Sequence, residues 1–247
     1  MFSDFFNNLL FFFLYVIINP RLIKPLINGL YLPVYVQFEW LKKYNFSTII
    51  DVGAYHGHVT KVLHYLFPTA RIYAFEPLEE NIRYIKSHVR FNGLHLEKFA
   101  LSSTLGKKIF YKTEYLPASS LLKLSNSIDN QTTSENIKTI VNSTTLDAYF
   151  KNINLKGNVL LKSDVQGAED QVLRGGSAFL KKVSVIHIET SFKKLYLGSC
   201  SFSQIYNILS KKGFEYCGSV PDGEFYPIFN PNEASNSIFI SKDIRQQ

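Results

Sequence analysis

Acidic residues and a glycine turn stand where apolar segments end in the first third of the sequence. The segment TIIDVGAYHGHVT, residues 48–60, runs from an apolar stretch into Asp51, Gly53 and Gly57. Glu76 follows a second apolar stretch, ARIYAFEP. A glycine turn lets backbone approach a ligand, and a carboxylate at the end of the next strand can accept hydrogen bonds from ribose hydroxyls. Together these residues predict a site for a nucleoside-containing ligand.

The glycine spacing argues against a dinucleotide. The fingerprint GxGxxG needs a small middle residue so that backbone can approach a pyrophosphate, and Tyr55 stands at that position. S-adenosylmethionine has no pyrophosphate, but it still requires a tight turn for its amino-acid end and an acid for its ribose. We expect Glu76 to bind the ribose, and Asp51 to hold either the glycine turn or the cofactor's amino group through charge-assisted hydrogen bonds.

A second group of polar residues follows two later apolar segments. Asp164 follows the apolar part of NVLLKSDVQG, and Glu189 lies near the end of VSVIHIET. Asp164 is the first candidate for a general base, and its alternative role is to cap a helix that begins near Gly167. Glu189 is the second candidate, as base or acceptor-binding group. His187 is expected to be a core residue.

Two further residues near these candidates have simpler expected roles. Lys162 is expected to pair with a neighbouring acid, and Glu169 to serve a helix amino terminus.

His56 and His58 have a spacing that resembles a metal pair, but no further ligands lie nearby in the sequence. We therefore expect no metal.

Short apolar runs alternate with helical segments from about residue 45, in the manner of a βαβ series. Strands are expected at 47–53, 70–77, 96–102, 158–167 and 183–190, with helices between them. Because the strands are continuously apolar, they favour an α/β fold whose mostly parallel sheet has helices on both faces. The segments 213–220 and 237–243 are predicted to close the sheet as a terminal antiparallel pair. Ala100, at the end of the third strand, is a further candidate for cofactor contact.

Residues 106–157 interrupt this alternation. They contain a predicted hairpin (KKIFYKT), a stretch rich in Ser, Asn and Thr, and a short helix near TTLDAYF. We interpret them as an insertion that forms either a wall or lid on the acceptor side, or a flexible surface segment. The expected organisation is an N-terminal helical and apolar segment, 1–44, followed by one domain, 45–247.

Composition limits the function classes. With 46% apolar and 19% charged residues, the 247-residue chain is expected to be globular. The net charge of +7 comes from dispersed lysines, which favours a solvated surface over nucleic-acid binding. Cys200 and Cys217 lack metal-site spacing, so two buried, reduced thiols are expected, as in a cytoplasmic protein.

The apolar run LLFFFLYVII, Leu9 to Ile18, raises the question of membrane contact. It is shorter than the about 20 residues that a spanning helix needs, and no basic region precedes it. Arg21 and Lys24 follow it, which leaves two interpretations: a signal anchor or interfacial helix, or a terminal helix that docks on the domain.

The order of these blocks resembles the FkbM-type S-adenosylmethionine-dependent methyltransferases, from about residue 48 to residue 190. The blocks, in sequence order, are DVGAYHGHVT, YAFEP with Asn81, Asn92, FALS with Gly106, SSL at 119–121, TTLDAYF, and LLKSDVQGAEDQVLRGG at 160–176. The chain departs from the family at two positions: Tyr55 stands where Asn is usual, and Gln166 where Glu is frequent.

The resemblance implies a Rossmann-like, class I methyltransferase fold and methyl transfer to a hydroxyl of a sugar, glycan or related natural product. In-line displacement at the sulfonium methyl depends on positioning, and a hydroxyl acceptor needs a base. Two alternatives remain at this point. One is a nicotinamide oxidoreductase of the same fold, and the other is a non-catalytic, membrane-associated binding protein. The sequence does not define the oligomeric state.

Overall fold

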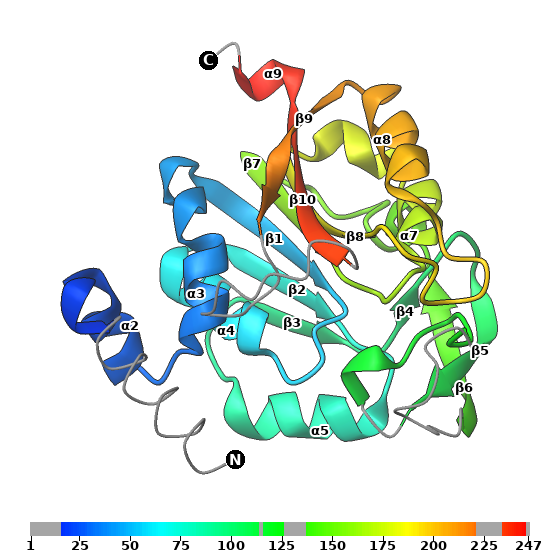
Figure 1. Ribbon diagram of the computed structural model, residues 1–247, viewed down its shortest axis with the longest axis horizontal. Helices are drawn as coiled ribbons and strands as arrows, with labels where there is room; N and C mark the ends of the chain where they lie inside the picture. The colour runs from blue at the N-terminus through cyan, green and yellow to red at the C-terminus, as the bar shows by residue number, and fades with distance from the viewer. Residues whose placement is uncertain (1–15, 114–115, 126–136, 221–233, 246–247) are drawn as a thin grey trace.

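The computed structural model describes residues 16–113, 116–125, 137–220 and 234–245, and its centre is a seven-stranded sheet (Figure 1). The strand order is β3-β2-β1-β7-β8-β10-β9. The bounds are β1 Phe46–Val52, β2 Arg71–Phe75, β3 Leu94–Glu97, β7 Asn158–Ser163, β8 Val185–Ser191, β9 Phe214–Val220 and β10 Ala234–Ser241. In the sheet, β2 and β3 lie on one side of β1, and the later strands β7 to β10 lie on its other side.

Parallel pairing joins β3, β2, β1, β7 and β8, and β10 runs antiparallel to both of its neighbours. The register aligns Asp51 of β1 with Lys162 of β7, and Lys162 with His187 of β8. Because aligned residues of neighbouring strands point to the same face, these three side chains lie on one side of the sheet. The predicted mostly parallel sheet with a terminal antiparallel pair is confirmed.

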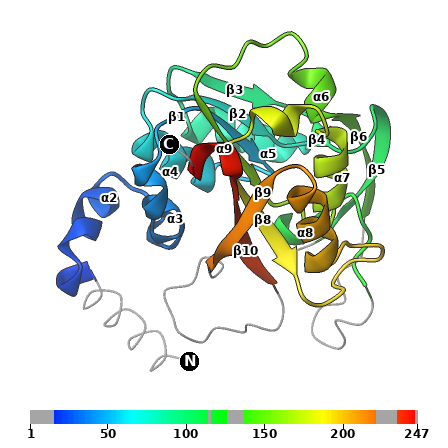
Figure 2. The ribbon, with the colours of Figure 1, turned by 90° about the horizontal axis from the view of Figure 1, so that it is seen from above.

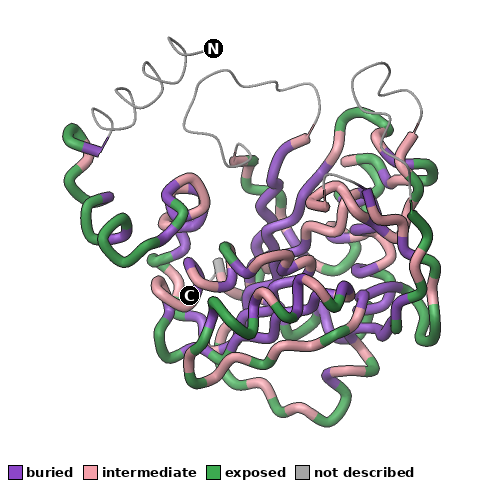
Figure 3. Tube along the Cα trace, turned by 90° about the horizontal axis from the view of Figure 1, so that it is seen from below, coloured by how far each residue is buried: buried purple, intermediate pink, exposed green. Residues whose placement is uncertain are grey.

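Helices cover both faces of the sheet, with α3 and α4 on one side and α7 and α8 on the other (Figure 2). Their bounds are α3 Leu32–Phe38, α4 His58–Leu66, α7 Glu169–Gly175 and α8 Phe202–Ser210; α5, Glu79–His88, packs on the α4 side. Ile49, Ile72 and Leu160 pack under α3 and α4, and Ile50 and Leu161 face α7 and α8. The buried residues gather in the centre of the molecule (Figure 3).

Residues 106–157 contribute to a separate three-stranded sheet, β4-β6-β5. Its strands are β4 Ala100–Leu101, β5 Gly106–Lys112 and β6 Ile137–Thr144, and α6, Leu146–Tyr149, follows. The expected single strand over 96–102 is wrong. Leu94–Glu97 pairs with β2, whereas Ala100 and Leu101 pair with β6, so the chain changes sheets at Lys98 and Phe99. The polar stretch at 126–136 lies outside the described residues.

Short helices precede the sheet: η1 Pro20–Leu22, α2 Ile23–Ile27, α3 and η2 Glu39–Lys43. Leu22, Tyr35 and Phe38 are buried in the core on the α4 side. Most of the apolar run Leu9 to Ile18 lies outside the described residues. Within the described ranges no helix is both long enough and apolar enough to span a bilayer.

The two cysteines differ in environment. Neither forms a disulfide, but Cys200 is buried whereas Cys217, on β9, is exposed. The expectation that both are buried is wrong for Cys217, because β9 is the last strand of the sheet order and its side chain at that position faces outward.

Candidate active site

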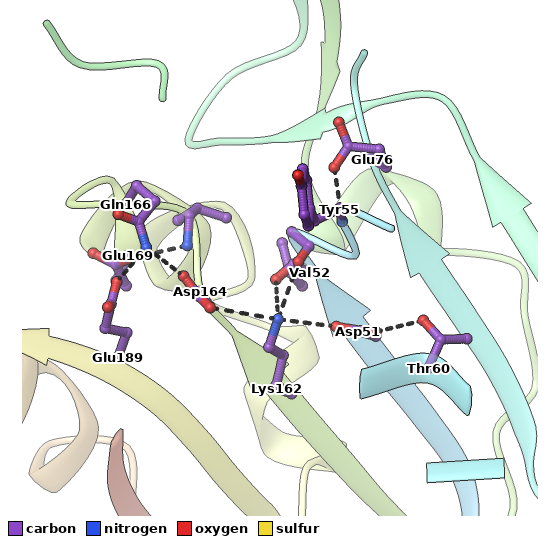
Figure 4. A network of polar contacts seen from close by, with 12 residues as sticks. Asp51, Val52, Tyr55, Thr60, Glu76, Lys162, Asp164, Gln166, Glu169 and Glu189 are labelled. Carbon is purple, nitrogen blue, oxygen red and sulfur yellow. Dashed lines mark hydrogen bonds and ion pairs between the residues drawn. The ribbon is translucent and has the colours of Figure 1, made fainter. Parts of the chain in front are cut away.

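A cavity of about 340 Å³ opens beyond the carboxyl ends of β1 and β7. β1 separates the two directions of strand addition, and ligands of open α/β sheets bind at this topological switch point. The residues that follow β1 and β2 line one end of the cavity, and those that follow β7, together with Glu189 of β8, line the other. Figure 4 shows the polar residues of both ends.

Glu76, which follows β2, is held at the first end by three protein donors. Its Oε2 accepts the backbone N–H of Tyr55 at 3.0 Å. Its Oε1 accepts the backbone N–H of Leu78 at 2.9 Å and the side-chain amide of Asn81 at 3.1 Å. A carboxylate has about four acceptor positions, so one position on Oε2 is left for a ligand hydroxyl. The sequence predicted the acid but not the three donors that orient it.

The environment of Glu76 suits a nucleoside. Burial raises the pKa of this carboxyl group to about 7, and the three donors act in the opposite direction. The cavity is also lined by the apolar residues Leu78, Phe99, Ala100 and Leu101, which supply apolar surface for a base. Predominantly apolar walls with one fixed polar group are typical of a cofactor site. The described residues therefore fit the adenosine part of S-adenosylmethionine.

The glycine turn after β1 is compact because Gly53 lies against the loop after β7. Gly53 has φ of +77°, and a Cβ there would lie 1.9 Å from the carbonyl oxygen of Asp164. Gly57 has φ of +78° and precedes the first residue of α4, but unlike Gly53 it does not line the cavity. Tyr55 lines it, and its ring stacks on His56 at 3.8 Å.

Asp51 lies beneath the turn and does not line the cavity. It is fully buried, accepts the hydroxyl of Thr60 at 2.6 Å and pairs with Lys162 Nζ at 3.1 Å. Lys162 also donates to the carbonyl oxygen of Gly53 at 3.0 Å. Of the two roles expected for Asp51, the structure supports holding the turn, through Lys162. The predicted pairing of Lys162 with an acid is what the structure shows.

Lys162 is positively charged although it is buried. Burial acts to lower its pKa, but the carboxylates of Asp51 and Asp164 outweigh burial and leave the pKa above its ordinary value. Lys162 Nζ also lies 3.8 Å from Asp164 Oδ2. The Lys162 cation therefore contacts both the glycine turn at the first end of the cavity and Asp164 at the second end.

Asp164 and Glu189 face each other at the second end, with Gln166 between them (Figure 4). The side-chain nitrogen of Gln166 donates to Asp164 Oδ1 at 2.8 Å and to Glu189 Oε2 at 2.9 Å. The side chain of Asp164 is 35% exposed, and all three residues line the cavity. The alternative role of Asp164 as a helix cap is not what the structure shows, because α7 begins after Ala168 and has no side-chain cap.

Two other residues near this end are buried and do not line the cavity. Glu169 accepts the backbone N–H groups of Val165 and Gly167, and burial raises its pKa to about 7. It lies in the first turn of α7, and its side chain holds the turn that precedes this helix. His187 is a core residue stacked on Phe38 at 4.4 Å. Burial and the charge of Lys162 lower its pKa to about 3.

Sequence reasoning missed two residues that complete this end. Tyr196 donates its hydroxyl to the side-chain oxygen of Gln166 at 2.8 Å. Ser120 donates its hydroxyl to the carbonyl oxygens of Val165 and Gln166. Both come from irregular segments distant in sequence. The block SSL at 119–121 was the one available signal for Ser120, and Tyr196 had none.

The sheet order, the crevice at β1 and the buried acid after β2 are typical of an α/β protein that binds a nucleoside-containing ligand. Residues 51–216 match the family described as the methyltransferase FkbM domain, so the chain is an S-adenosylmethionine-dependent methyltransferase. The chain therefore belongs to the FkbM methyltransferase family, as its motifs predicted, and the nicotinamide oxidoreductase and the non-catalytic binding protein are set aside.

Known proteins of related sequence and structure include the following. The 2-O-methyltransferase NoeI of Sinorhizobium fredii (strain NBRC 101917 / NGR234) is 26% identical over 184 residues, which cover 71% of this chain and 75% of NoeI. The crystal structure of methyltransferase FkbM from Methylobacillus flagellatus KT has a TM-score of 0.47 at 13% identity and matches 79% of this chain and 44% of that one. This chain thus spans less than half of that structure. Magnesium protoporphyrin IX methyltransferase from Synechocystis PCC 6803 also has a TM-score of 0.47 at 13% identity, over 84% of this chain and 77% of its own.

Proposed function

We propose that the protein transfers the methyl group of S-adenosylmethionine to a hydroxyl oxygen of a sugar, glycan or related natural product. One observation carries this proposal: the cavity has a buried acid at its cofactor end and the carboxylate pair Asp164 and Glu189 at the other. A hydroxyl acceptor must lose a proton during transfer, and a carboxylate is the group that can take it. The related protein NoeI is a 2-O-methyltransferase, which supports an oxygen acceptor.

Asp164 is the proposed general base and Glu189 the proposed acceptor-binding group. Bound S-adenosylmethionine would supply an electrophilic methyl carbon on a sulfonium. Asp164 would take the proton that the acceptor hydroxyl loses as its oxygen displaces the thioether sulfur from that carbon. Asp164 suits the role of general base better than Glu189, because its carboxylate is the more exposed of the two and the base must reach the acceptor hydroxyl.

The proposed cofactor contacts are Glu76 to ribose, the backbone of Gly53 and Tyr55 to the amino-acid end, and Ala100 to the base. Asp51 and Gly57 are proposed to act by shaping the turn, since neither lines the cavity. These roles predict that Glu76→Ala abolishes or strongly weakens binding of S-adenosylmethionine and S-adenosylhomocysteine in isothermal titration. Glu79→Ala is the matched control, because Glu79 is an exposed acid on α5 that pairs with Lys98.

The pKa of about 7 at Glu76 gives this titration a second readout. Ribose hydroxyls donate to the ionised carboxylate and so favour ionisation. Wild-type binding should therefore weaken as the pH falls below 7 and should release protons near neutrality, seen as a dependence of the heat on buffer ionisation enthalpy. Unchanged binding by Glu76→Ala would show that the cofactor site is wrongly assigned.

The acceptor is tested by incubating wild type and Asp164→Asn with a panel of hydroxylated glycans and following methylation by mass spectrometry. We expect methylated product with wild type and a loss of turnover, at unchanged cofactor affinity, with Asp164→Asn. A wild type that binds the cofactor but methylates only nitrogen or carbon acceptors would contradict the proposal.

We also propose that the N-terminal segment contacts a lipid surface. Ile17, Ile18 and Ile27 are 67%, 72% and 79% exposed; Ile17 and Ile18 end the apolar run that begins at Leu9, and Ile27 lies in α2. Lys24 lies in the same segment and can approach anionic headgroups. Exposed apolar side chains beside basic ones are typical of segments that lie in the membrane interface.

A further inference from the structure

The side-chain amide of Gln166 has a defined orientation. Its two neighbours on one side, Asp164 and Glu189, are carboxylates, which only accept hydrogen bonds when ionised. The NH₂ group supplies two donors, one for each carboxylate. A flipped amide would place its carbonyl oxygen against both carboxylates and would lose both hydrogen bonds.

Tyr196 determines this orientation from the other side. Its hydroxyl lies 2.8 Å from Gln166 Oε1 and 3.0 Å from the carbonyl oxygen of Ala118. Both neighbours are acceptors, so the phenol must donate. Burial raises the pKa of Tyr196, and the charges of Glu189 and Asp164 raise it further, so the phenol keeps its proton.

The backbone around Gln166 is held in an unfavourable conformation by several segments. Gln166 has φ of +56°, a left-handed value that is unfavourable for a non-glycine residue. Ser120 and Glu169 bind backbone groups of this turn. A Cβ on Gly167 would lie 3.0 Å from the ring of Tyr196. The turn is thus fixed by contacts from both sides, and the side chain of Gln166 is directed at the two carboxylates.

We propose that Tyr196 is a positioning residue for methyl transfer, which acts by fixing the Gln166 amide so that it holds Asp164 and Glu189 apart and in place. This inference rests on the proposed function. Gln166 donates to Oδ1 of Asp164, and Oδ2 lies 3.8 Å from Lys162, beyond hydrogen-bonding distance. Oδ2 therefore has more open acceptor positions than Oδ1 for the proton of the acceptor hydroxyl. Without the tyrosine hydroxyl, the amide can rotate and release both carboxylates.

The test compares Tyr196→Phe, Gln166→Ala and the double variant. Loss of one hydrogen bond predicts a roughly five- to tenfold lower kcat for Tyr196→Phe, with an altered pH profile of kcat. The affinity for S-adenosylhomocysteine should not change, because Tyr196 does not line the cavity. The effect of Tyr196→Phe should largely disappear in the Gln166→Ala background, whereas a role in packing alone would give additive losses. Tyr206→Phe, on α8 and 42% exposed, is the control and should leave kcat unchanged.

A measurement independent of turnover separates this inference from the proposed function. The side-chain ¹⁵N–¹H signals of Gln166, identified by their loss in Gln166→Ala, should shift in Tyr196→Phe and stay in place in Tyr206→Phe. Unshifted signals, or wild-type kcat and pH profile in Tyr196→Phe, would overturn the role of Tyr196. Failure of wild type to methylate any hydroxyl acceptor would overturn the proposed function and leave the NMR result to decide the amide contact.

Discussion

Tyr55 and Gln166 are the two non-glycine residues with positive φ in the described part of the chain, and they flank the same cavity. Such conformations cost free energy and persist where surrounding contacts determine them, often at functional sites. At Tyr55 the contacts are the ring stack on His56 and the backbone hydrogen bond to Glu76. Asn, the usual family residue at position 55, is among the residue types that tolerate this conformation best.

Gly53 offers a test of the close approach between the two loops. Gly53→Ala combines a left-handed φ with an overlap on the carbonyl oxygen of Asp164. Gly213→Ala is the matched control, since Gly213 has φ of +87° and nothing within 4 Å of an added Cβ. We expect Gly53→Ala to lower the free energy of unfolding by about 1–3 kcal/mol more than Gly213→Ala, measured by urea denaturation. Equal losses would mean that the two loops separate at little cost.

At the scale of elements, β1 and β7 are joined by the buried pair of Asp51 and Lys162 as well as by backbone hydrogen bonds. Lys162→Met leaves the Asp51 carboxylate buried without its cation, which should cost about 3–5 kcal/mol of unfolding free energy. Adding Asp51→Asn removes the charge and keeps an acceptor for Thr60, so the double variant should recover much of the loss in urea denaturation. A double variant less stable than Lys162→Met would contradict this account.

Lys98→Met is the control for that experiment. Lys98 pairs with Glu79 on the surface, where solvent screens both charges, so its replacement should change stability little. A loss comparable with that of Lys162→Met would show that the method reports a general effect of removing lysines.

The elements differ in how far local sequence determines them. Strands β1, β2, β7 and β8 were predictable because continuously apolar segments, each buried on both faces, end at polar turns. The break between β3 and β4 was not, because β4 pairs with β6 from a segment about forty residues later. The acids at strand ends were predictable for the same reason as the strands. The partners that orient them, such as Tyr196 and Ser120, come from irregular segments with no periodic signal.

At the scale of the whole molecule, the exposed isoleucines of the N-terminal segment predict vesicle binding. Wild type should float with vesicles that contain phosphatidylglycerol, and Ile18→Ser with Ile27→Ser should lose most of this binding. The matched control is Ile109→Ser with Ile140→Ser, which removes a cross-strand pair of isoleucines, 50% and 71% exposed, from β5 and β6. Equal flotation of both double variants would contradict the proposed contact, and a wild-type dimer without flotation would assign the surface to a second copy.

The adjacency of β1 and β7 also has a kinetic consequence. Lys162 and Gly53 touch across the switch point although they lie 109 residues apart in the chain. Closing so long a loop costs entropy before any contact rewards it, and non-local strand pairing is slow for this reason. We expect a nascent or refolding chain to gain its helices and the β1–β2 unit early and its crevice late. The protein should therefore bind the cofactor only after the sheet is complete, so cofactor binding should appear with the slowest refolding phase.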